Sequence, residues 1–159
     1  ELLIGAELYY FPGMWEAQAL PQLCIEGTRT LLLEMPFAQW TQEMKNDIQK
    51  IITERGLNVM LAHIDRYYLL QKDKRVWNEV FNLPVCAQMN AGSLMDRKRR
   101  RFSLKFLLKH TAVLGSDCHD REHRPPNLKQ AREEIRKKLG AKKLAEIDQL
   151  GETILNIKH

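Results

Sequence analysis

Cysteine is scarce in this sequence, and long hydrophobic runs are absent from it. The three cysteines, Cys24, Cys86 and Cys118, show no paired spacing, which favours a reducing compartment over a disulfide framework. No apolar stretch approaches the roughly 20 residues that a membrane-spanning helix needs, and the N-terminus carries no signal-peptide pattern. With 44% hydrophobic residues, the sequence predicts a globular, cytoplasmic protein that does not insert into a membrane.

The net positive charge is concentrated in two places. The formal charge is +5, five consecutive basic residues occupy positions 97–101, and a second basic run follows Pro126. A solvated helix face commonly carries such runs, whereas attraction of an acidic peptide is the more specific interpretation. Nucleic acid is disfavoured as a partner, because no aromatic residues alternate with these charges to stack on bases.

Short apolar runs alternate with longer helical patterns along the chain. The runs cover residues 2–10, 30–37, 57–64, 84–91 and 111–117. Helical periodicity predicts helices over residues 41–56, with Thr41 as N-cap, and over 72–83, 94–110, 126–140 and about 142–155. This alternation predicts an α/β protein with a parallel sheet. Most of a (β/α) barrel without its opening units and an open doubly wound sheet are both compatible with it.

A polar group able to bind a metal ion or a proton stands near the end of each apolar run. These residues are Glu7, Glu34, His63, Gln88 with Asn90, and Asp117 with His119. Catalytic groups of parallel α/β folds gather at the carboxyl ends of the strands. Taken singly, Glu34 is better explained as a support or a cap than as a ligand, and His63 as a structural histidine.

The pair Asp117-x-His119 is the most specific of these signals. On an extended backbone, two residues separated by one point the same way, and a carboxylate with an imidazole suits Mn²⁺, Fe²⁺ or Zn²⁺. Arg66 follows His63 by three residues, and Arg124 follows His119 by five. The planar guanidinium fork of arginine matches a phosphate group.

The same segment permits a competing interpretation, because Cys118 and Arg124 have the spacing of a cysteine phosphatase loop. Such a loop surrounds phosphate with backbone N–H groups and calls for small residues or glycine. Residues 119–123 contain no glycine, and two of them are acidic. A thiolate mechanism is therefore disfavoured, and Cys118 is expected to be a small, packed residue.

Several segments, taken together and in order, resemble the PHP-type protein-tyrosine phosphatases of bacterial capsule and exopolysaccharide loci. They are GAELYY, TLLLEMP, LAHIDRYYLL, AQMNAGSL and GSDCHDREHRPPNLKQA. The resemblance extends over essentially the whole chain. It implies a single phosphatase domain over residues 1–159, folded as a distorted (β/α)₇ TIM-like PHP barrel. The H-x-H pair on the family's first strand would lie before Glu1, so the N-terminal strand units are expected to be missing from this chain.

The resemblance also implies roles for individual residues. The implied metal ligands are Glu7, His63, Asp117 and His119, and the implied phosphate-holding catalytic residues are Arg66 and Arg124. The implied cofactors are divalent metal ions, with Mn²⁺ expected and Fe²⁺ or Zn²⁺ as alternatives.

The implied activity is hydrolysis of phosphotyrosine by a metal-bound hydroxide. The implied partner is the phosphotyrosine-containing C-terminal tail of a bacterial tyrosine kinase of capsule or exopolysaccharide synthesis, which basic residues 97–101 would attract. Two alternatives remain open at this point. One is a PHP-type phosphoesterase for a small sugar or histidinol phosphate, and the other is a catalytically impaired phosphate-binding module.

Overall fold

The computed structural model describes residues 2–120, 122 and 125–156. Its centre is a parallel sheet of five strands: β1 (Glu7–Tyr9), β2 (Thr30–Glu34), β3 (Asn58–Leu61), β4 (Cys86–Asn90) and β5 (Ala112–Gly115). The strand order in the sheet is the order along the chain. The predicted parallel α/β class is confirmed, and the order contains no reversal of the kind that marks the switch point of a doubly wound sheet.

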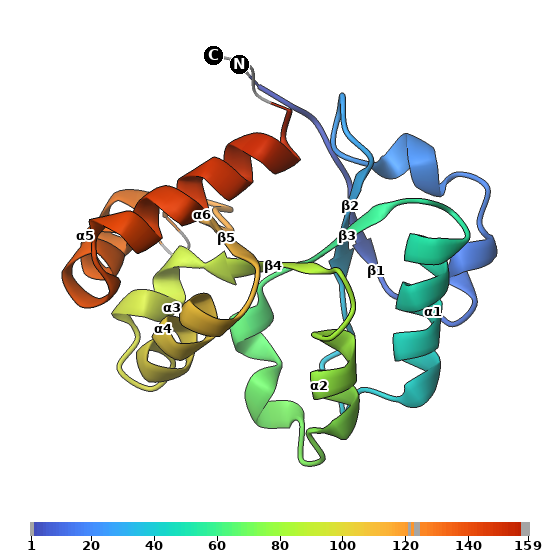
Figure 1. Cartoon of the computed structure of the whole chain (residues 1–159), viewed down its shortest axis with the longest axis horizontal. Helices are drawn as coiled ribbons and strands as arrows, with labels where there is room; N and C mark the ends of the chain where they lie inside the picture. The colour runs from blue at the N-terminus through green and yellow to red at the C-terminus, as the bar shows by residue number, and fades with distance from the viewer. Residues whose placement is uncertain (1, 121, 123–124, 157–159) are drawn as a thin grey trace.

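Helices connect the strands and follow one another around the sheet (Figure 1). They are α1 (Gln42–Thr53), α2 (Arg75–Val80), α3 (Ala91–Met95), α4 (Arg100–Lys109), α5 (Leu128–Leu139) and α6 (Ala141–Ile154). Short 3₁₀ turns complete the connections: η1 (Met14–Glu16), η2 (Leu20–Leu23), η3 (Ile64–Arg66) and η4 (Tyr68–Leu70). Among the described residues, every helix is too short or too polar to cross a membrane.

Two predicted elements differ from the structure. Only the end of the run 2–10 is a strand, because β1 begins where it reaches β2, and the residues before it bond to the loop around Leu23 and Glu26 instead. The predicted helix 94–110 is interrupted at Asp96. The Asp96 carboxylate accepts the N–H groups of Lys98 and Arg99, and this local turn competes with helix continuation.

The hydrophobic core lies between the sheet and the helices. Alternate residues of β2, Leu31 and Leu33, and the inner face of α1, with Ile48 and Ile51, are fully buried. Burying such a side chain contributes roughly 1.5–3 kcal/mol each, so these contacts fix the sheet against α1.

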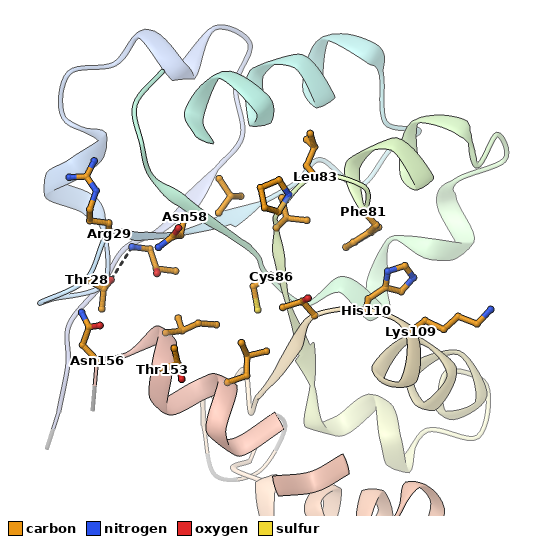
Figure 2. A pocket seen from close by; sticks show the side chains of 17 residues that line it. Thr28, Arg29, Asn58, Phe81, Leu83, Cys86, Lys109, His110, Thr153 and Asn156 are labelled. Carbon is orange, nitrogen blue, oxygen red and sulfur yellow. Dashed lines mark hydrogen bonds between the residues drawn. The ribbon is translucent and has the colours of Figure 1, made fainter. Parts of the chain in front are cut away.

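A cavity of about 470 Å³ opens at the amino edge of the sheet, where the strands begin (Figure 2). Its walls include Asn58 and Cys86 at the starts of β3 and β4, together with Thr153 of α6. Burial raises the pKa of the Cys86 thiol to about 12, so this thiol is protonated and a poor nucleophile at neutral pH. None of the described candidate site residues lines this cavity, and in parallel α/β folds the catalytic groups gather at the opposite, carboxyl edge.

The N-cap of α1 provides a test of the local sequence signal. The Thr41 side chain accepts a hydrogen bond from the Met44 N–H at 3.4 Å, as predicted. Thr41→Ala is expected to lower the free energy of unfolding by about 1 kcal/mol in urea denaturation. The matched control is Thr53→Ala at the other end of the same helix, where the hydroxyl donates to the Gln49 carbonyl, with an expected loss below about 0.5 kcal/mol. Equal losses at the two positions would contradict the capping role.

Candidate active site

The carboxyl edge of the sheet brings two carboxylates to one imidazole. Glu34 is the last residue of β2, and His63 follows the end of β3 by two residues. Glu7 begins β1 instead of ending it, but its side chain reaches the same point. One ligand atom from each of these three residues lies within 4.8 Å of the other two. The His63 Nε2 atom is 3.0 Å from Glu7 Oε1 and 3.3 Å from Glu34 Oε1.

Tyr67 and Phe37 fix the orientation of the His63 ring. His63 is only 2% exposed, and its Nδ1 lies 3.0 Å from the Tyr67 hydroxyl. That hydroxyl also accepts the Met35 N–H at 3.2 Å, and the Phe37 ring stacks parallel to the imidazole. Burial raises the pKa of Tyr67, so its phenol is protonated and neutral at physiological pH. These contacts direct Nε2, and not Nδ1, at the two carboxylates.

A chain of polar contacts connects His63 with Asp117 across the neighbouring strands. The His63 N–H donates to the Gln88 side-chain oxygen, and the Gln88 amide donates to Asn90 Oδ1 at 2.9 Å. The Asn90 amide then donates to Asp117 Oδ2 at 3.3 Å, and the Arg66 guanidinium donates to the same oxygen. Two predicted site residues, Arg66 and Asp117, are therefore in direct contact.

The segment after β5 differs from the extended strand end that the sequence suggested. Asp117 has a φ of 51°, in the left-handed region, so the alternation of an extended strand does not apply to it. His119 is exposed, and its Nδ1 lies 3.6 Å from Asp117 Oδ1. The two side chains are thus neighbours. Within the described part of the chain, neither belongs to the group formed by Glu7, Glu34 and His63.

Two further predictions concern this segment. Cys118 was expected to be packed, and that expectation is wrong, because the chain has already left the sheet and the thiol is exposed. Its Sγ lies 3.6 Å from the Asp120 carbonyl oxygen. Arg124, the second predicted phosphate-holding residue, lies outside the described residues, so its role stays a prediction.

An ion pair between a buried carboxylate and a partly exposed arginine supports the site. The Asp65 carboxylate, next to the candidate residues of η3, accepts the Asn90 N–H at 3.0 Å and pairs with Arg99 at 2.9 Å. Burial raises the pKa of Asp65, while the Asn90 N–H and the Arg99 charge oppose this effect. Arg99 belongs to the basic run 97–101 and also pairs with Asp96. One member of that run therefore has a structural role.

The sequence reasoning missed part of this arrangement. The sequence favours a support or a cap over a ligand for Glu34, whereas the structure places its Oε1 3.3 Å from His63 Nε2. The contact of Tyr67 with His63 is not predicted from the sequence. The signal that could indicate it is the position of Tyr67 four residues after His63, but the segment is too short to be recognised as a helix. Asp65 had also been overlooked, because burial of a carboxylate is not visible in one sequence.

The converging donor set fits a divalent cation. A single Nε2–H group cannot satisfy two carboxylates, and Glu7 and Glu34 repel each other when both are ionised. A cation bound by the imidazole and both carboxylates would remove that repulsion. Two carboxylates and one imidazole are ligands that Mn²⁺, Fe²⁺ and Zn²⁺ accept. The Tyr67 hydroxyl would then take the outer position that orients a ligating histidine.

Comparisons with a family model and with individual known proteins agree on one family. Residues 1–153 match the model of a family described as capsular polysaccharide synthesis, CpsB/CapC. A tyrosine-protein phosphatase CpsB of Streptococcus agalactiae is 27% identical over an alignment of 143 residues that covers 82% of this chain and 58% of the relative. The protein of the same name from Streptococcus pneumoniae is 28% identical over an alignment of 155 residues that covers 90% of this chain and 63% of the relative. The chain thus spans less than two thirds of the length of these relatives.

A solved structure has the same fold. It superposes with a TM-score of 0.84 over 98% of this chain and 64% of its own, at 19% identity. It comes from work on YwqE of Bacillus subtilis and CpsB of Streptococcus pneumoniae, described as unique metal-dependent tyrosine phosphatases.

Gly115 allows a test of the polar chain behind His63. A Cβ added at Gly115 would lie 2.2 Å from the Gln88 side-chain nitrogen, so Gly115→Ala must displace Gln88 from His63 and Asn90. The Gln88 side chain is flexible, and the fold is therefore expected to persist. We expect Mn²⁺ affinity in calorimetry to fall about tenfold, the usual scale for losing an outer support of a metal site. Gly151→Ala, where a Cβ meets nothing within 4 Å, is the matched control. Unchanged affinity in Gly115→Ala would argue against a role for Gln88.

Proposed function

The chain belongs to the CpsB/CapC family of capsular polysaccharide synthesis proteins, and we propose that it catalyses the metal-dependent hydrolysis of phosphotyrosine. The observation that carries this proposal is the convergence of Glu7, Glu34 and His63 at the carboxyl edge of the sheet. The names of the relatives, tyrosine-protein phosphatases, support the reaction class. Because those relatives are longer, the activity of the whole protein is part of the proposal.

The metal ions would be held by the three converging residues, with Asp117 and His119 as further ligands. Mn²⁺ is the proposed ion, with Fe²⁺ or Zn²⁺ as alternatives that the same donors accept. A divalent cation supplies Lewis acidity and a nucleophilic water at neutral pH. Within the chain, the Tyr67 hydroxyl and the Gln88 side-chain oxygen keep the His63 ring and backbone in position for binding.

Arg66 is proposed to hold the phosphate of the substrate. Its side chain is one-quarter exposed, and its guanidinium lies against Asp117. A guanidinium carries five N–H donors in a fixed fork. It can therefore keep the Asp117 contact and still offer donors to an anion. Arg124 is proposed as the second phosphate-holding residue. Together they would bind the equatorial oxygens, where charge must be stabilised during phosphoryl transfer.

We further propose that the sheet forms the larger part of a distorted (β/α)₇ PHP barrel within a single phosphatase domain. The unbroken strand order supports it. Among the described strands, β1 and β5 each pair on one side only, which leaves both edges open to the additional strands that closure requires. The three free cysteines support a cytoplasmic location. The proposed substrate is the phosphotyrosine-containing C-terminal tail of a tyrosine kinase of capsule or exopolysaccharide synthesis.

Paired variants separate the metal mechanism from the thiolate mechanism. Glu34→Gln keeps the shape of the side chain but removes the charge, and we expect Mn²⁺-dependent phosphate release from a phosphotyrosine peptide to fall at least about 100-fold, since metal and charge stabilisation are lost together. Cys118→Ser is expected to keep wild-type activity. Glu43→Gln on the exposed side of α1 is the matched control for the loss of one carboxylate.

Contrary results are easily recognised. Activity that survives a chelator but disappears in Cys118→Ser would refute the metal mechanism. Faster hydrolysis of small sugar phosphates or histidinol phosphate than of the phosphopeptide would favour the alternative substrate class. Measuring the metal content of the purified chain separates both cases from a phosphate-binding module without a metal.

A further inference from the structure

A second groove, with a volume of about 520 Å³, lies along α4. Its floor is formed by the aromatic side chains of Tyr68, Trp77, Phe102 and Phe106, and its rim is basic. No carboxylate is among the described residues that line it. We call it the basic groove. Because α4 follows the end of β4 and precedes the start of β5, the groove runs from the catalytic edge of the sheet toward the opposite edge.

The rim cations form a regular stripe. Arg101, Lys105 and Lys109 are spaced four residues apart and therefore share one face of α4, and Lys98 precedes them by about one turn. All four are exposed. The stripe from Arg101 to Lys109 is about 12 Å long at the helical rise of about 1.5 Å per residue. An extended peptide covers that length with about four residues.

These cations differ from their neighbours in the same basic run. Arg99 is neutralised by Asp65 and Asp96, and Arg100 pairs with Glu134. Within the described residues, the cations of the stripe have no such carboxylate partner. The structure thus divides the run into arginines that stabilise the fold and cations whose charge is directed at the basic groove. An uncompensated row of cations attracts an anionic partner.

The aromatic floor indicates which anionic partner fits. The Tyr68 and Phe102 rings stack on each other with centroids 4.4 Å apart, and the Lys74 ammonium covers Tyr68 at 3.9 Å from the ring centroid. Trp77 and Phe106 are 4% and 3% exposed. Because these ring faces are occupied, nucleic-acid bases have no stacking platform. A hollowed site suits a peptide better than a flat lipid surface.

We propose that the basic groove binds an acidic segment of the polypeptide substrate, whose carboxylates meet the stripe. The phosphotyrosine being hydrolysed would lie at the carboxyl edge, and the groove would hold residues further along the same polypeptide. The identification of this polypeptide as substrate rests on the proposed function, whereas the binding itself does not.

The binding test uses the full chain with a chelator present, so that the metal site does not contribute. The probe is a fluorescein-labelled, unphosphorylated peptide with a tyrosine flanked by glutamates, followed by fluorescence anisotropy. The double variant Arg101→Glu/Lys105→Glu is expected to bind it at least about tenfold more weakly, since opposed charges now repel. The control Lys137→Glu/Lys138→Glu, at the exposed end of α5, changes the net charge equally and should bind within about twofold of wild type.

Other results would overturn the inference. Equal weakening in both double variants would reduce the effect to net charge. Tighter binding of a single-stranded RNA oligonucleotide or of phosphatidylserine vesicles, with the same loss in Arg101→Glu/Lys105→Glu, would assign the groove to another class of partner. Unchanged binding of the glutamate-rich peptide in that variant would remove the groove from binding altogether.

A kinetic comparison separates this inference from the proposed function. With Mn²⁺, Arg101→Glu/Lys105→Glu is expected to raise the KM for a long acidic phosphopeptide about tenfold, while hydrolysis of p-nitrophenyl phosphate stays unchanged. If wild type hydrolyses neither compound, the proposed function fails, and the anisotropy result still decides on the groove. Equal loss on both compounds would contradict a separate docking site.

Discussion

The imidazole of His63 is the contact on which the rest of the site depends. Its Nε2 stands between the carboxylates of Glu7 and Glu34, which come from two other strands. Three strands must therefore keep their relative positions for the group to form. The parallel register provides this, because it sets Glu34 level with Tyr9 of β1 and the end of β2 beside the end of β3. The core beneath α1 is thus a condition for the chemistry at the edge.

The carboxylates at this edge of the sheet differ in whether an arginine neutralises them. Asp65 is buried but pairs with Arg99, and Asp117 pairs with Arg66. Glu7 and Glu34 differ from these two, since among the described residues their only positive partner is an imidazole whose charge depends on a proton. In the described part of the chain, the supporting carboxylates Asp65 and Asp117 are each paired with an arginine, whereas the central carboxylates Glu7 and Glu34 are not. This distribution explains why the fit to a divalent cation is specific to the centre.

The sequence predicts the fold better than it predicts the site. Near-continuous apolar runs gave the five strands, and the Thr41 cap gave the start of α1, because both depend on local chemistry. The break at Asp96 was missed, since a side chain that competes for backbone N–H groups looks the same as any other acidic residue in a helical pattern. The contacts of Glu34 and Tyr67 with His63 are not evident from the sequence, because they depend on register and on a short 3₁₀ turn. The outward position of Cys118 depends on the left-handed Asp117, which no composition rule indicates.

Strained backbone conformations occur mainly at candidate site residues. Three residues other than glycine have a left-handed φ in the described chain, and two of them are His63 and Asp117. The third, Asn156, follows α6, where asparagine commonly replaces glycine. Gly27 and Gly56, in the loops at the amino edge, reach positive φ without a Cβ and so without that cost. Non-glycine residues in this region cost of order 1–3 kcal/mol each and persist where the surroundings fix them. The hydrogen bonds of Gln88 and Asn90 connect both strained residues. These contacts hold the two strained conformations and so keep in position the groups that the proposed reaction needs.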